Sequence, residues 1–310
     1  MSRSLVRFRL PALQSPGNRT FSFSAGYNDF SRIIPAERSV MKLFVQADDY
    51  GMTTGVTDGI VACGRDGILT QTGLFTNMPS AEYAVRRWRQ EMPHVLLGQD
   101  LNLSTGRPVT DPKLIPSLVN EDGSFLTSRQ HRVKEAETPD HVRYEDAYLE
   151  YDNQVKRFIE LTGEKPGYIG PHAWFNETTN RAMNDIIEKY GCRSSTKLIN
   201  PSDSSFLRIG GWSKPVIRED KSYDYSVNTQ LAQDPLEYWN SGLKEEIIRH
   251  APEDVLCMLH THAGFLDRDL YRLSSFSAVR PMEAGFLCSE EMRSFVRDYN
   301  IELVNYSYFD

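Results

Sequence analysis

The sequence has little cysteine and no long apolar run. Its 310 residues hold four cysteines, Cys63, Cys192, Cys257 and Cys288, which lie far apart and form no CxxC pair. This spacing argues against a zinc ribbon and against a dense disulfide framework. We expect reduced, mostly buried thiols in a cytoplasmic protein. No stretch approaches the ~18 consecutive apolar residues of a membrane span, so we expect no membrane insertion.

The sequence also lacks an excess of basic residues and the common nucleotide-binding motifs. With 35 Lys and Arg against 42 Asp and Glu, the net charge is −7. That balance argues against a nucleic-acid surface and against docking on anionic lipid. No Walker A sequence occurs, and Asp48-Asp49-Tyr50-Gly51 stands where a dinucleotide-binding chain would carry GxGxxG. The 40% hydrophobic and 25% charged content is that of an ordinary globular protein.

The first forty residues differ from the rest. They hold six Arg, no Lys, one Asp and one Glu, a net charge of +4 that leaves −11 for the remainder. They lack the apolar core of a secretory signal, and their two acidic residues weaken a transit-peptide interpretation. We interpret 1–40 as a disordered tail or an over-long start, because Met41 opens the first strand-like segment. Residues 41–310 are expected to form a single catalytic domain.

After Met41, strand-like and helix-like segments alternate. Strands are expected at 43–47, 70–76, 95–103, 168–172, 254–262 and 301–304. Helices are expected at 55–66, 81–91, 144–162, 178–190, 235–250 and 289–299, the second capped by Ser80, with a long polar loop at 104–140. The alternation predicts an α/β fold with a parallel sheet. Six or more units in ~270 residues suit a closed or nearly closed barrel, and a doubly wound open sheet is the alternative.

Polar residues end several of the predicted strands, where parallel α/β folds place their active sites. They are Asp48, Asp49, Asn77, Asp100, Asn102, His172, His260 and His262. The acidic residues and the histidines each have a structural alternative: helix capping for Asp48 and Asp49, a solvated edge strand for Asp100, and packed structural histidines for His172, His260 and His262. Together, carboxylates and imidazoles at four strand ends suit one divalent metal that polarises a carbonyl and activates water.

Asp48 and Asp49 are the most informative pair. Two neighbouring carboxylates raise one another's pKa unless a cation lies between them. One could then bind a metal while the other stays free as a general base. Asp100 adds to this, because a strand buried on both faces should carry an aspartate only if it is paired or metal-bound.

Several motifs, in consistent order from about residue 41 to residue 310, resemble the YdjC-like carbohydrate deacetylases, the family that includes chitooligosaccharide deacetylase. Gln46 to Gly51 resembles the family's ADD(F/Y)G motif, GQDLNLSTGRP at 98–108 resembles GLHLNLTEGRP, and His262-Ala263-Gly264-Phe265 resembles HPGY. The resemblance implies an α/β fold, an incompletely closed (β/α) barrel of the glycoside hydrolase/deacetylase type. It also implies metal-dependent hydrolysis of N-acetyl groups on sugars.

The resemblance further implies roles for individual residues. Asp49, Asp100 and His172 would be the metal ligands, and Asp48 would be the general base that deprotonates the metal-activated water. His262 would be a general acid or would orient the carbonyl. Apart from what the resemblance implies, we expect Arg280, Asn102 and Trp174 to contact the substrate.

This sequence departs from the family pattern at two places. Asp100 stands where the family has a ligand histidine, which favours Mg²⁺ or Mn²⁺ more than a site with two histidines would. We expect one divalent ion, Mg²⁺, with Mn²⁺ or Zn²⁺ as the alternatives. Trp174 replaces the second histidine of the SHxH segment.

Two other functions remain open from the sequence. One is a glycoside hydrolase on a similar barrel that uses Asp48 and Asp100 as its carboxylate pair. The other is a non-catalytic sugar-binding homologue, in which Trp174 stacks on a sugar ring. The expected partner is a small acetylated sugar, with no nucleic acid and no membrane, and base rates alone favour a homodimer.

Overall fold

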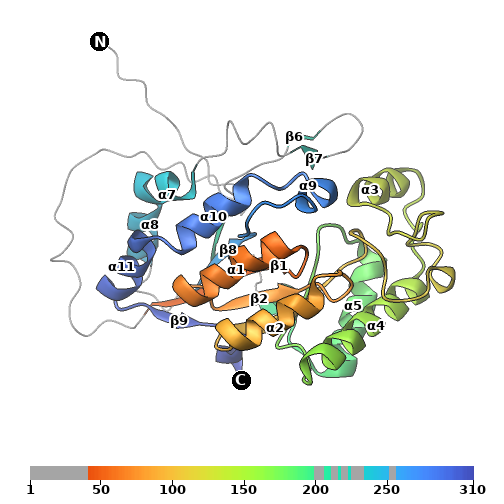
Figure 1. Ribbon diagram of the computed structural model, residues 1–310, viewed down its shortest axis with the longest axis horizontal. Helices are drawn as coiled ribbons and strands as arrows, with labels where there is room; N and C mark the ends of the chain where they lie inside the picture. The colour runs from red at the N-terminus through yellow and green to blue at the C-terminus, as the bar shows by residue number, and fades with distance from the viewer. Residues whose placement is uncertain (1–40, 199–205, 211–215, 218–222, 225–233, 251–255) are drawn as a thin grey trace, which may run out of the picture.

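The computed structural model describes residues 41–198, 206–210, 216–217, 223–224, 234–250 and 256–310 (Figure 1). The expectations for 1–40, and for the start of the strand at 254–262, lie outside these residues. The strands are β1 (Lys42–Tyr50), β2 (Gln71–Leu74), β3 (Leu96–Leu101), β4 (Ile169–Pro171), β5 (Phe206–Gly210), β6 (Val216–Ile217), β7 (Tyr223–Asp224), β8 (Leu256–Thr261) and β9 (Glu302–Val304).

Seven of these strands form one parallel sheet. Its order is β4-β3-β2-β1-β8-β5, and β9 pairs with the first half of β1. Beyond β4 the described residues add only an isolated parallel bridge between Ile169 and Ser194, so hydrogen bonds do not close the sheet between β4 and β5. The predicted α/β fold and incompletely closed barrel are confirmed.

Helices lie around this sheet (Figure 1). They are α1 (Thr54–Asp66), α2 (Ala81–Glu91), α3 (Ser128–Glu137), α4 (Tyr144–Thr162), α5 (Glu177–Tyr190), α6 (Ser195–Leu198), α7 (Pro235–Tyr238), α8 (Lys244–His250), α9 (Leu270–Leu273), α10 (Val279–Leu287) and α11 (Glu290–Asp298). The described helices are all too short or too polar to cross a lipid bilayer. The four cysteines are free thiols, as expected, with Cys63 and Cys257 buried and the other two half-buried.

Three expectations about local structure were wrong, and one helix was missed. The segment 104–140 is no structureless loop, because it contains α3, which begins at a capping box of Thr127 and Gln130. Ser80 precedes α2 without a side-chain cap, because its backbone is helical (φ −84°, ψ 0°) rather than extended, and its hydroxyl donates to the Gly51 carbonyl. The predicted helix at 235–250 is interrupted at Gly242, where φ is 128°. Helix α10 was not expected at all.

Successive side chains of β1 point to opposite faces of the sheet and therefore belong to two different apolar clusters. Leu43, Val45 and Ala47 of β1 belong to the large cluster that includes helical residues such as Val56 and Ile60. Phe44 of the same strand packs inside the barrel against side chains from other strands and the C-terminal segment, namely Tyr168, Met258, Val304 and Tyr306. Further along this inner face of β1 come Gln46 and Asp48, so the barrel interior becomes polar toward the carboxyl end of the strand.

Two strand glycines make room inside the barrel. A Cβ on Gly73 of β2 would overlap the Asp100 carboxylate, and a Cβ on Gly98 of β3 would overlap the Tyr168 ring. Glycine within a strand commonly marks such a close approach. The carboxylate of Asp100 therefore lies over the neighbouring strand rather than in solvent.

Buried carboxylates of α4 hold the segment that follows β3. Glu150 accepts hydrogen bonds from the backbone N–H groups of Val109 and Thr110, at 3.0 and 2.9 Å. Asp146 accepts one from the N–H of Ser117 at 2.9 Å. Because buried backbone donors need partners, these contacts fix a long irregular segment beside the strand ends.

Candidate active site

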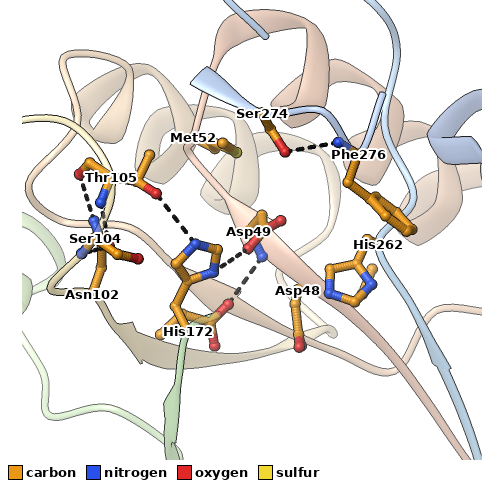
Figure 2. Close-up of polar contacts among 12 residues, drawn as sticks. Asp48, Asp49, Met52, Asn102, Ser104, Thr105, His172, His262, Ser274 and Phe276 are labelled. Carbon is orange, nitrogen blue, oxygen red and sulfur yellow. Dashed lines mark hydrogen bonds and ion pairs between the residues drawn. The ribbon is translucent and has the colours of Figure 1, made fainter. Parts of the chain in front are cut away.

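A local distortion of β1 brings two adjacent carboxylates into one site. Neighbouring strand residues normally point to opposite faces, but the pairing of β1 with β2 shifts register between Ala47 and Tyr50. Asp49 within this irregularity has a φ of 72°. Figure 2 shows Asp48 and Asp49 between His172 and His262. The helix-capping alternative is wrong, because α1 is capped by Thr53, whose hydroxyl accepts from the Val56 N–H.

Asp49 contacts three other residues of the site. Its Oδ2 lies 2.6 Å from Nη2 of Arg280, and its Oδ1 lies 2.9 Å from Nδ1 of His172. Its backbone N–H donates to Oδ2 of Asp100 at 2.9 Å. Burial raises the pKa of Asp49, but Arg280 and His172 outweigh burial and hold that pKa well below its usual range. Asp49 is therefore ionised at neutral pH.

His172 follows β4 and is turned into the site by a tight bend. Ala173 has a φ of 52°, and the N–H of Trp174 donates to the His172 carbonyl at 2.7 Å. The His172 ring meets Phe75 edge-on, with centroids 4.6 Å apart. Its Nε2 lies 3.3 Å from the hydroxyl of Thr105, so the two ring nitrogens face Asp49 and Thr105.

Asp100 is buried, with 3% of its surface exposed, and β3 lies between β2 and β4. The alternative of a solvated edge strand is therefore wrong. Burial and the neighbouring carboxylates of Asp48 and Asp49 raise the pKa of Asp100 well above its usual value. Three acidic groups thus share a site in which Arg280 supplies one positive charge.

On the other side of the site, His260 lies near the end of β8 and His262 directly follows the strand. Nε2 of His260 lies 2.7 Å from Oδ2 of Asp48. Burial raises the pKa of Asp48, but His260, His262 and Gln46 together lower it to about 2. Burial lowers the pKa of His262 to about 4, so its imidazole is neutral at pH 7. The His262 backbone is held by helix α10, since its N–H donates to Glu283 at 2.7 Å.

The three expected substrate contacts, Arg280, Asn102 and Trp174, are all buried, with 1, 0 and 5% of their surfaces exposed. Arg280 bridges Asp49 and the backbone carbonyls of His262 and Phe276. Asn102 accepts from the N–H groups of Ser104 and Thr105 and so shapes the loop beside His172.

Trp174 packs away from solvent. It stacks on the ring of His131, with centroids 3.9 Å apart, and its Nε1 donates to Glu135 at 3.0 Å. Contact of these three side chains with a substrate stays a prediction.

The sequence interpretation missed several groups at this site. It noted His260 but did not connect it with Asp48, although the spacing of His260 and His262 places both on one face. Thr105 lies within the motif at 98–108, and Glu283 belongs with Arg280 to the part of the resemblance near the C-terminus, but neither residue was given a role. The contact between Arg280 and Asp49 joins residues 231 positions apart, which no local pattern indicates.

The surroundings of one carboxylate oxygen of Asp49 indicate whether the site could hold a metal ion. Oδ1 of Asp49 is buried and makes no hydrogen bond, although it lies only 2.9 Å from Nδ1 of His172. The two atoms are close but not aligned for donation, as expected of two ligands of one cation rather than of a bonded pair. The surplus of carboxylates over positive charge agrees with this, so the residues fit a divalent cation.

The expected third ligand, Asp100, makes a different contact. Oδ2 of Asp100 accepts from the Asp49 backbone, and the described part of the chain shows no group of three or more His, Cys, Asp or Glu side chains arranged to hold a metal ion. The assignment of Asp100 as a ligand stays a prediction.

The fold and the site together define a barrel-like α/β protein with carboxylates and imidazoles gathered at the carboxyl ends of its strands. The family described as YdjC-like protein matches residues 42–298, and the chain belongs to this family. The resemblance in the motifs is thereby confirmed.

Curated relatives match almost over their full lengths. Carbohydrate deacetylase 2 of Listeria innocua is 30% identical over 275 residues, 86% of this chain and 98% of the relative. The carbohydrate deacetylase of Thermoanaerobacter pseudethanolicus is 28% identical over 270 residues, again 86% of this chain and 98% of the relative.

A crystal structure shares the fold. It is an Enterococcus faecalis protein described as a candidate for cellobiose-phosphate cleavage, with 23% identity and a TM-score of 0.66 over 87% of this chain and 99% of that one.

Proposed function

We propose that this protein is a metal-dependent carbohydrate deacetylase that removes N-acetyl groups from sugars or oligosaccharides. The observation that carries the proposal is the convergence of Asp48, Asp49, His172 and His262 at one set of strand ends. It occurs in a chain whose curated relatives are carbohydrate deacetylases.

Asp49 and His172 would hold the divalent ion through Oδ1 and Nδ1, and Asp100 would complete the set. When bound, such an ion polarises the acetyl carbonyl and lowers the pKa of water. Arg280 engages the other oxygen of Asp49 and leaves Oδ1 directed at His172. The carboxylate-rich set favours Mg²⁺, with Mn²⁺ and Zn²⁺ as the alternatives.

Asp48 is the proton acceptor in this proposal. Its low pKa keeps it ionised at neutral pH, so its carboxylate accepts a proton from the attacking water. The proton then returns to the leaving amine, which balances hydrolysis of the amide to acetate and a free amino sugar.

His262 has a narrower role than the sequence suggested. Because its imidazole is neutral at pH 7, it carries no spare proton to give to the amine. A neutral N–H is suited to donating a hydrogen bond to the acetyl carbonyl, and this is the role that the lowered pKa favours.

Acetate release from a panel of N-acetylated mono- and oligosaccharides tests the proposal. The protein is stripped of metal with EDTA and refilled with Mg²⁺, Mn²⁺ or Zn²⁺. We expect acetate release that requires metal. Release of reducing sugar that survives EDTA would instead support a glycoside hydrolase, and tight sugar binding without turnover under any metal would support a binding protein.

A further inference from the structure

The Asp48 carboxylate is held at both of its oxygens. Nε2 of Gln46 donates to Oδ1 at 2.6 Å, and Nε2 of His260 lies 2.7 Å from Oδ2. An ionised carboxylate can only accept hydrogen bonds, so the imidazole nitrogen is the donor in the second contact. The carboxylate plane is therefore fixed from two directions and is not free to rotate.

Both holding residues come from the sheet rather than from loops. Gln46 and Asp48 lie two residues apart on the same face of β1. Gln46 is directly opposite His260 in the pairing of β1 with β8. Side chains that project from paired strands are placed more exactly than side chains on loops, so the orientation of Asp48 is built into the barrel.

A chain of amides fixes which end of Gln46 faces Asp48. The backbone N–H of Tyr306 donates to Oε1 of Gln71 at 3.0 Å, and Nε2 of Gln71 donates to Oε1 of Gln46 at 2.8 Å. The chain starts at a group that can only donate and ends at a carboxylate that can only accept. Each buried amide therefore has one allowed orientation, and the aligned hydrogen bonds strengthen one another.

We propose that His260 and Gln46 are positioning residues for Asp48 and together form a carboxylate clamp. The clamp rests on the proposed function, in which Asp48 accepts the proton of the attacking water. A base must present its oxygen at hydrogen-bond distance and in line with the proton it removes. Loss of either holder lets the carboxylate rotate, which slows the chemical step without weakening substrate binding.

Steady-state kinetics on the metal-loaded enzyme test the clamp. Loss of a group that orients a reacting residue typically costs about 10- to 100-fold in activity. We expect His260→Leu to lower kcat by that factor and to change KM less than about twofold. His260→Gln, which keeps an N–H donor near the position of Nε2, recovers most of the loss. His94→Leu, at an exposed histidine between α2 and β3, is the matched control and leaves both constants unchanged.

A double-mutant comparison separates the clamp from a structural role. In the Asp48→Asn background, His260→Leu has no further effect on kcat, because the group that it orients is already gone. Multiplicative losses from the two substitutions overturn the proposal. So does a His260→Leu variant that raises KM and leaves kcat intact, or a His260→Gln variant as slow as His260→Leu.

An NMR measurement tests the contact between His260 and Asp48 without relying on enzyme activity. In protein with ¹⁵N-labelled histidine, Asp48→Asn is expected to shift the Nε2–H resonance of His260 and to leave that of His94 in place. An unmoved His260 resonance overturns the clamp even in an active enzyme. If the wild-type protein releases no acetate with any metal, the proposed function fails, and this measurement still decides whether His260 holds Asp48.

Discussion

Nη2 of Arg280 lies 2.6 Å from Oδ2 of Asp49, and both side chains are almost completely buried. The same guanidinium donates to the carbonyls of Phe276 and His262. Helix α10 is thereby joined to the ends of β1 and β8. Because a buried charge is stable only with its partner, this contact is both a structural and a functional element.

Arg280→Met is expected to destabilise the protein strongly. It leaves the Asp49 carboxylate buried without its cation, and breaking one side of a buried pair costs about 3–5 kcal/mol. Arg280→Lys keeps the charge but loses the planar set of donors, so we expect an intermediate loss. Urea unfolding measures both. The control, Arg297→Met at an exposed ion pair, is expected to change the free energy of unfolding by less than about 1 kcal/mol.

Asp49→Asn is expected to weaken the binding of divalent cations and to abolish acetate release. The substitution removes the negative charge from the oxygen that lies beside His172 Nδ1. Calorimetric titration of the EDTA-stripped protein with Mg²⁺ or Mn²⁺ measures affinity without any turnover, and we expect a loss of at least about tenfold. The exposed Asp298→Asn is the control. Wild-type affinity together with full activity in Asp49→Asn is the result that contradicts the assignment.

Gly73→Ala tests the space that β2 leaves for Asp100. The new Cβ would overlap the Asp100 carboxylate, which is enclosed and has little room to retreat. We expect a loss of about 1–3 kcal/mol in the free energy of unfolding, together with reduced activity. Gly285→Ala in α10 is the matched control, because its Cβ meets no atom within 4 Å, and a helical alanine is expected to stabilise by up to about 1 kcal/mol. Equal stability of the two variants would mean that Asp100 does not occupy this space.

The parts of this site that the sequence predicts are those set by local periodicity. The helix expected over 144–162 has the observed bounds, Tyr144–Thr162, because its apolar positions and its flanking Gly163 are local signals. The strand-end rule likewise selects Asp48, Asp49, Asp100 and His172 as neighbours, because it needs only the positions at which apolar strands stop.

The remaining features depend on contacts between distant residues. Ser80 has the right residue type for a cap, but its backbone lies in the helical region and its hydroxyl donates to the distant Gly51 carbonyl. Trp174 stacks on the ring of His131, forty-three positions earlier, and no local pattern indicates that contact. The capping box of Thr127 and Gln130 is the one local signal for α3, and it is easily missed because the helix carries few apolar residues.

Acid is expected to destabilise the fold through His131. Burial lowers the pKa of His131 to about 3, whereas an unfolded histidine titrates near 6.5. Between these values the unfolded chain binds more protons, so stability is retained above about pH 6.5 and falls as the pH falls toward 3. At pH 4.5 this one group should cost about 3 kcal/mol relative to pH 7.5.

Urea unfolding at those two pH values, in wild type and in His131→Phe, measures the contribution of His131. Phenylalanine keeps a ring to stack on Trp174 and removes the titrating group. His262, whose pKa is lowered to about 4, acts in the same direction and remains in both proteins. A pH dependence that is identical in wild type and variant would contradict a buried, neutral His131.

Trp174→Ala is expected to release α3 from the strand ends. The indole is the surface on which His131 stacks, and it also binds Glu135 of the same helix. Replacing a buried tryptophan by alanine lowers the free energy of unfolding by about 3–5 kcal/mol. In this protein the substitution removes the contact between α3 and the bend that follows His172. We expect faster proteolytic cleavage within 127–141, with Trp174→Phe showing a smaller change because it keeps a stacking ring. Cleavage at the wild-type rate in Trp174→Ala would show that the capping box and the Leu103 carbonyl bonded to His131 hold α3 without the indole.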